Sequence, residues 1–86
     1  MSEKKLIQIA SDYRKNIMNK YDFSRLMDLD YRNKILNNLV FEYTRLEKIL
    51  SDIDTSYYDG LPRTHEDRIE LDLTINLIRD IESVVS

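Results

Sequence analysis

The chain contains one glycine and one proline, and both lie in the short segment Asp59-Gly60-Leu61-Pro62. These two residue types interrupt helices most strongly, so this segment is the one strong break in 86 residues. Apolar residues recur at helical spacing before the segment and again after it. The sequence therefore predicts two antiparallel helices that reverse direction at Gly60.

Length and composition indicate a single helical domain over residues 1–86. A chain of this size buries only about 60 to 65% of its unfolded surface, so its core is small and pairing with a second molecule often completes it. It has no cysteine, which excludes disulfides and thiolate metal sites. No apolar run approaches the roughly 18 residues that are needed to cross a membrane. The apolar stretch near the N-terminus is too short and too interrupted for a signal peptide. We expect a cytoplasmic protein.

The isoleucine, asparagine and alanine content is unusual for a helical protein. Ten isoleucines and six asparagines accompany one alanine, although alanine is the best helix former. This balance favours an AT-rich coding sequence over a physical cause. It suggests an origin in an AT-rich bacterial genome, or in a phage, plasmid or other mobile element that lives in one.

The first helix is predicted over residues 3–21. Its apolar side chains recur every three or four residues, which is the pattern of an amphipathic helix. They are Leu6, Ala10, Tyr13, Ile17 and Tyr21. The same phase would next bury Ser24 and Asp28, so we expect a turn within residues 22–30. Four polar residues in that stretch are candidate N-caps, namely Asp22, Ser24, Asp28 and Asp30.

A second apolar stripe, with the spacing of a coiled coil, predicts a long helix over residues 30–57. This seam comprises Leu36, Leu39, Tyr43, Leu46, Leu50, Ile53 and Tyr57. A helix of that length spans about 40 Å, whereas the first helix covers about 27 Å. The excess leaves apolar surface for a second chain, so we expect a homodimer or a partner helix in a groove.

A third helix is predicted over residues 65–85. Thr64 and Asp67 have the spacing of a capping box, and Glu66 and Asp67 place negative charge at the start of the helix. Residues 69–77 also alternate between apolar and polar, which leaves a strand as the alternative. On a helical wheel the apolar residues fill one broad arc, which favours a helix. The predicted fold is an all-α three-helix bundle, completed by dimerisation.

No catalytic, metal or cofactor site is predicted. His65, Glu66 and Asp67 are consecutive, so in a helix they point about 100° apart, whereas helical metal ligands lie three or four residues apart. Glu66 and Glu70 share a face, but with Asp67 they supply too few oxygen ligands for a hard cation. No glycine-rich phosphate loop and no nucleophile motif is present. We expect a protein that is not an enzyme.

The leading functional prediction is a protein–protein interaction module: a small regulator, inhibitor or adaptor that binds another protein or itself. The seam would supply the interface, and Tyr57, Tyr58 and Leu61 would extend it at the turn. The alternative is a nucleic-acid-associated protein, because residues 1–34 carry a net charge of +3 against −6 for residues 35–86. Its contacts would be Lys4, Lys5, Arg14, Lys15, Lys20 and Arg25.

Overall fold

Four α-helices and one short 3-10 helix account for most of residues 3–85, the part of the chain that the computed structural model describes. The helices are α1 (Glu3–Lys20), η1 (Phe23–Arg25), α2 (Leu29–Ser51), α3 (Thr55–Asp59) and α4 (Glu66–Val85). No strand occurs within that range, so the all-α prediction is confirmed. None of its helices combines the length and apolar character needed to cross a membrane.

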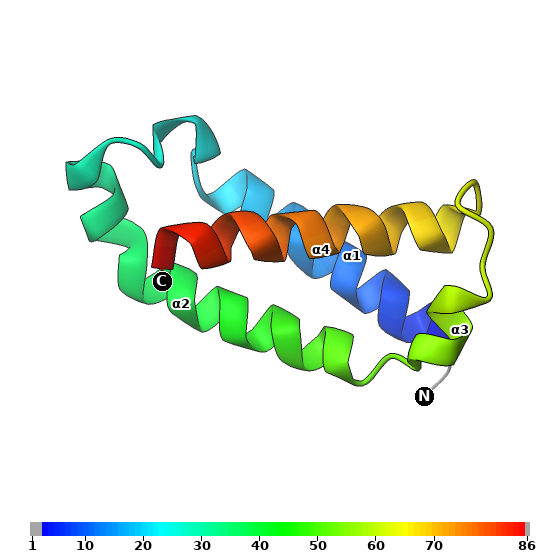
Figure 1. Ribbon diagram of the computed structural model, residues 1–86. Coiled ribbons are helices and arrows are strands. Elements are labelled where there is room, and N and C mark those ends of the chain that lie inside the picture. The colour runs from blue at the N-terminus through cyan, green and yellow to red at the C-terminus, as the bar shows by residue number, and fades with distance from the viewer. Residues whose placement is uncertain (1–2, 86) are drawn as a thin grey trace.

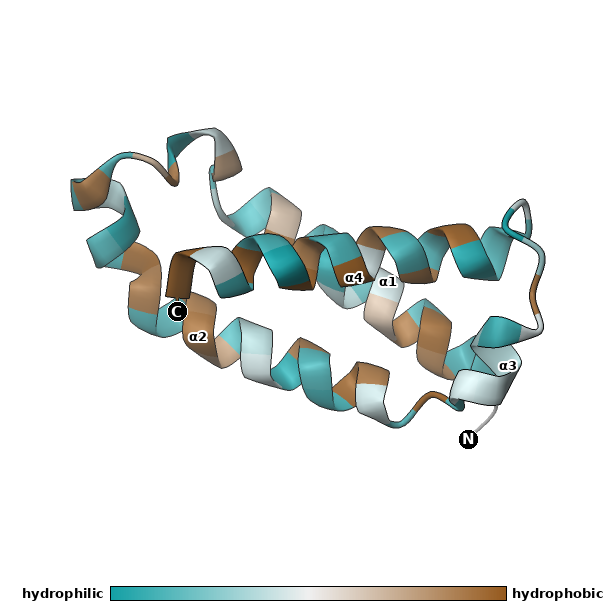
Figure 2. Ribbon diagram, in the orientation of Figure 1, coloured by the Kyte–Doolittle hydropathy of each residue, from teal (hydrophilic) through white to brown (hydrophobic). Residues whose placement is uncertain are grey.

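The three long helices contact one another pairwise. Figure 1 shows α1 and α4 running in the same direction, with α2 antiparallel to both. Figure 2 shows apolar and polar segments alternating along each of them, as expected where one face is buried. The small helix α3 packs at the end where α1 begins, and a bond from the Asp54 backbone N–H to the Glu3 carboxylate (2.9 Å) ties the two together.

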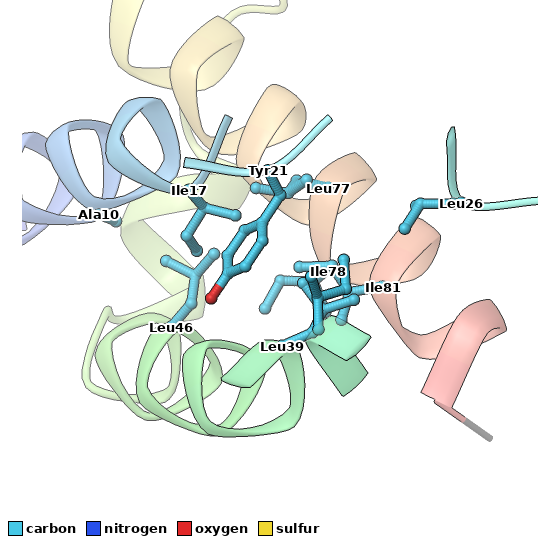
Figure 3. Close-up of a cluster of buried hydrophobic side chains, with 10 residues drawn as sticks. Ala10, Ile17, Tyr21, Leu26, Leu39, Leu46, Leu77, Ile78 and Ile81 are labelled. Carbon is cyan, nitrogen blue, oxygen red and sulfur yellow. The ribbon is translucent and has the colours of Figure 1, made fainter. Parts of the chain in front are cut away.

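The core lies along the common axis of α1, α2 and α4. Ile17, Leu39, Leu46 and Ile81 lose essentially all exposure there. Figure 3 shows these side chains converging from three helices, with the Tyr21 hydroxyl ending beside Leu46. Each fully buried aliphatic side chain contributes about 1.5 to 3 kcal/mol. This core, rather than intrinsic helix propensity, holds the long helices together.

The alternating segment at residues 69–77 lies within α4, so the helix prediction is confirmed and the strand alternative is wrong. Its apolar residues divide between two environments. Leu71 and Leu77 are buried, whereas Ile69 and Leu73 are about half exposed. α4 carries apolar residues on its exposed side as well as on the side that faces the core. Apolar and polar residues can therefore alternate along residues 69–77 although the segment is a helix.

The turn without glycine or proline is present, and aspartates form it. The Asp22 carboxylate accepts from the Ser24 N–H (3.1 Å) at the start of η1. The Asp28 carboxylate accepts from the N–H of Asp30 (3.1 Å) and caps α2. Of the four candidate caps, Asp22 and Asp28 thus satisfy free amides at a helix start. Ser24 and Asp30 instead supply the N–H groups that these two aspartates cap.

The helix predicted over residues 30–57 is instead two helices, and this changes the argument for a partner. α2 ends at Ser51, and Asp54 adopts an extended conformation and caps α3 through the N–H of Ser56 (2.9 Å). Ile53, between the two helices, is buried. α2 therefore spans about 34 Å rather than 40 Å. Its excess over α1 is correspondingly smaller than the sequence suggested.

The long helices on either side of the Gly60 segment are antiparallel as expected, but the chain does not reverse at Gly60 alone. Gly60 follows α3 with φ of −79° and ψ of −9°, a conformation open to any residue. An added Cβ would lie 3.3 Å from the carbonyl oxygen of Ser56, a close approach that favours glycine. Chain reversal is spread over α3 and residues 60–65. At the start of α4, His65 Nδ1 accepts from the Asp67 N–H (3.1 Å), in the place predicted for Thr64.

Candidate protein-binding surface

The predicted seam is divided between the interior and the edge of α2 that faces α4. Its enclosed members are Leu39, Leu46 and Ile53. Its half-buried members on α2 are Leu36, Tyr43 and Leu50. The Tyr43 hydroxyl contacts the Glu82 carboxylate of α4 at 3.5 Å. The enclosed residues are covered by α1 and α4. Only the half-buried residues of the seam are accessible to a partner.

An apolar depression opens where α2, α3 and α4 meet. It has a volume of about 170 Å³ and is lined by Leu50, Ile53, Thr55, Tyr58, Leu71 and Ile75. We call it the α2–α4 depression. Three of its residues, Leu50, Ile53 and Tyr58, belong to the set predicted from the sequence to bind a partner. Leu71 and Ile75 come from α4, and the sequence did not identify them.

Tyr58 is held firmly at the wall of the depression. Its hydroxyl donates to the Asp72 carboxylate, and this hydrogen bond is the main cause of its raised pKa. The Arg68 guanidinium lies 4.2 Å from the centre of the Tyr58 ring. Arg68 also donates to the carbonyl oxygens of Tyr58 (3.3 Å) and Leu61 (3.1 Å). A single arginine therefore fastens α3 and the following loop to α4.

The two other residues predicted at the turn are drawn toward α4 as well. The Tyr57 hydroxyl donates to the Asp67 carboxylate (3.0 Å), which raises the pKa of Tyr57. Leu61 is half-buried. Neither Tyr57 nor Leu61 lines the depression, so Tyr58 is the aromatic side chain of the turn that does.

The six basic residues of the nucleic-acid alternative do not form one surface. Five of them are spread around α1, because consecutive helical positions are about 100° apart, and Arg25 lies on η1. Lys4, Lys5 and Lys15 line a groove with Glu66, Asp67 and Glu70. Lys20 lies 3.7 Å from Glu42, and Arg25 lies 3.6 Å from Asp28. Each therefore has acidic neighbours of its own.

Arg14 is a structural residue of the interface between α1 and α4. Its side chain is only 10% exposed, and its Nη2 lies 2.7 Å from the Glu70 carboxylate. The Ser11 hydroxyl donates to the same carboxylate (2.9 Å), and together these contacts lower the pKa of Glu70. Arg14 also donates to the Glu70 carbonyl oxygen (3.1 Å). Arg14 is therefore mostly buried and already paired, unlike an exposed cation that is available to a partner.

The acidic residues near His65 are engaged in similar structural contacts. Asp67 accepts from Tyr57, and Glu70 pairs with Arg14. Among residues 3–85, no group of three or more histidine, aspartate or glutamate side chains is placed to hold a metal ion.

Sequence reasoning missed two exposed apolar areas. One lies over α1 and α4 and includes Met18, Ile69 and Leu73. The other lies over α1 and α2 and includes Ile9 and Phe41, which is 57% exposed. Both consist of residues outside the coiled-coil seam, so a search for the dominant stripe passes over them. Ile69 and Leu73 lie four residues apart, and that helical spacing could have found them. Met18, Ile9 and Phe41 give no such signal.

No protein-family model, curated protein or solved structure matches this chain. Its function is therefore inferred from its own residues and their geometry.

Proposed function

We propose that this chain is a non-enzymatic protein–protein interaction module, acting as a regulator, inhibitor or adaptor. Its binding surface is the α2–α4 depression, and its partner is another protein or a second copy of itself. The observation that carries the proposal is an open apolar hollow with walls from three helices. Solvent-exposed concave apolar surface of this kind is typical of sites that take a partner's side chain.

The size of the depression suits one large apolar side chain. An apolar cavity of about 150 Å³ holds a benzene molecule, and the depression has a volume of about 170 Å³. Burial of one leucine or phenylalanine there contributes about 1.5 to 3 kcal/mol. The Arg68–Tyr58 contact keeps the wall in place before binding, which lowers the ordering cost of association.

Further apolar side chains lie along the same edge of α2, beyond Glu47. Leu36 and Tyr43 are half-buried there, and Val40 is 41% exposed. These residues follow the accessible half of the predicted seam. A second copy that covers this strip together with the depression would form the homodimer that we propose as the first partner.

The test compares two isoleucine substitutions in the same helix. Ile75→Asp places a charge in the depression, whereas Ile69→Asp places one on a separate exposed surface. We expect multi-angle light scattering to show loss of the dimer for Ile75→Asp alone. If the wild-type protein is monomeric, the same two variants are compared with it in a pull-down from the native host. A protein retained by wild type and Ile69→Asp but lost with Ile75→Asp supports the proposal, and no such protein contradicts it.

Nucleic-acid association through the basic N-terminal helix is the second candidate, and we place it below protein binding. Its six residues are divided among several surfaces, and Arg14 is buried. Nuclease treatment of the pull-down separates the two candidates. Partners held through nucleic acid disappear on digestion, whereas direct protein partners remain.

A further inference from the structure

The outer surface of α1 and α2 combines exposed apolar side chains with basic ones. We call it the basic–aromatic face and define it by Ile9, Tyr13 and Lys20 of α1 and Lys34, Phe41, Arg45 and Lys48 of α2. The α1 members are four and seven residues apart, and those of α2 are seven, four and three apart. Such spacings place each set in one line along its helix. The face lies apart from the α2–α4 depression, which uses the other edge of α2.

Contacts between the two lines show that they lie side by side. The Arg45 guanidinium lies 5.8 Å from the centre of the Tyr13 ring and 5.6 Å from that of Phe41. Lys20 lies 3.7 Å from Glu42 of α2. Arg45 thus bridges an aromatic side chain from each helix while remaining exposed. Tyrosine, phenylalanine and arginine are enriched at protein interfaces, and tyrosine and arginine dominate their energetics.

The charge on this face is opposite to that of the whole chain. It carries four cations, although the net charge of the protein is −3. The acidic side chain between its two lines is Glu42, whose carboxylate is only 10% exposed and is paired with Lys20. α4, by contrast, contains six acidic and two basic side chains. Cations are therefore gathered on this part of the α1–α2 surface, whereas acidic side chains predominate on α4.

An acidic residue lies beyond each end of the row of basic side chains on α2. Asp30 lies four residues before Lys34, and Asp52 lies four residues after Lys48. The cations between them cover about 21 Å of helix. A continuous phosphate backbone that crosses the face would meet these carboxylates on leaving it. A bounded acidic segment of about four helical turns would fit between them.

We propose that the basic–aromatic face docks a short acidic segment of another protein. Apolar side chains of that segment would rest on Phe41 and Ile9, and its carboxylates would face Lys20, Lys34, Arg45 and Lys48. Phe41 and Ile9 are 57% and 37% exposed, so they are accessible without any rearrangement. The proposal adds a second docking surface and holds whether or not the α2–α4 depression binds a partner.

The probe is a fluorescein-labelled peptide of 15 residues with helical propensity, rich in glutamate, with leucine and phenylalanine two turns apart, because Ile9 and Phe41 lie on opposite sides of the Tyr13–Arg45 contact. Its affinity for the full chain is measured by fluorescence anisotropy in about 50 mM NaCl, where surface charge is weakly screened. Arg45→Glu and Phe41→Ser are each expected to weaken binding about tenfold or more. Matched changes on α4, Arg79→Glu and Leu73→Ser, are expected to change it less than about twofold.

Four results would overturn the proposal. Equal losses for Arg45→Glu and Arg79→Glu would show a dependence on net charge alone. Undiminished binding of a peptide with serine in place of leucine and phenylalanine would remove the apolar contribution. Tighter binding of a 15-nucleotide oligothymidine, lost with the same variants, would indicate nucleic acid. Self-association that is lost with Phe41→Ser would make a second copy the occupant. Circular dichroism melting checks that each variant is folded.

Discussion

The buried ion pair between α1 and α4 gives a sharp test of the structure. We consider Glu70→Ala, which removes the carboxylate that receives both Arg14 Nη2 (2.7 Å) and the Ser11 hydroxyl (2.9 Å). Arg14 then keeps its hydrogen bond to the Glu70 backbone carbonyl but has no counterion at a site where it is only 10% exposed. The substitution therefore leaves a nearly buried cation unpaired.

The expected cost is about 2 kcal/mol. Hydrogen bonds to charged groups contribute about 1.5 to 3 kcal/mol each when buried, and two are lost here. The Glu70 side chain is 26% exposed, so water weakens both contacts and roughly halves the sum. For a domain of this size, about 2 kcal/mol lowers the melting temperature by about 10 °C. Asp80→Ala, an exposed site on the same helix, is expected to cost less than about 0.5 kcal/mol.

Urea unfolding of the two variants and wild type measures this difference, and pH provides a second readout. Because the folded state lowers the pKa of Glu70 below 4.5, its stabilisation is present above that pH and is lost as the pH falls through the folded pKa. The gap between wild type and Glu70→Ala should close on acidification. Equal costs for Glu70→Ala and Asp80→Ala, or a gap that persists at acid pH, would refute the reasoning.

Three further predictions concern single side chains. The Tyr21 hydroxyl is buried with no hydrogen-bond partner, so Tyr21→Phe should raise the free energy of unfolding by about 1 kcal/mol; a loss in urea unfolding would contradict this. Asp54→Ala removes the N-cap of α3 and should cost about 1 kcal/mol, with faster hydrogen exchange of the Ser56 amide. The raised pKa of Tyr58 means that stability is lost as the pH rises above 10 through the folded pKa. Tyr58→Phe should therefore make the free energy of unfolding fall less steeply with alkaline pH. An unchanged dependence on pH would argue against the Asp72 contact.

The first and last helices could be predicted closely because their signals are local. Predicted bounds of 3–21 and 65–85 compare with Glu3–Lys20 and Glu66–Val85 in the structure. Apolar spacing fixes which face of a helix is buried, and short polar residues near the start of a helix satisfy its free amides. Both depend on residues within a few positions of one another, so a single sequence contains them.

The break after α2 escaped the same reasoning for a physical reason. Ile53 lies seven residues after Leu46, in phase with the seam, and it is buried although the helix has already ended. The apolar pattern is therefore the same for a continuous helix and for a broken one. The signal was present in Asp54-Thr55-Ser56, a run of cap-forming residues like those before α2.

The candidate surfaces depend on which helices meet, and the sequence specified them only in part. Leu50, Ile53 and Tyr58 were predicted as partner contacts, but Leu71 and Ile75 complete the depression from α4. The basic–aromatic face also needs two helices, because Arg45 approaches Tyr13 only once α1 lies beside α2. Positions on one stripe cannot reveal neighbours that come from another.

The sequence by itself determined that this protein is helical, which face of each long helix is apolar, and that a turn with polar caps precedes the second long helix. These properties arise from periodicity and capping within a few residues. Tertiary structure alone decided which apolar and charged residues remain accessible. Arg14 looks like an available cation in the sequence, yet it is buried because Glu70, 56 residues further along the chain, is brought against it. Such long-range pairing follows from the packing of whole helices, which no local pattern encodes.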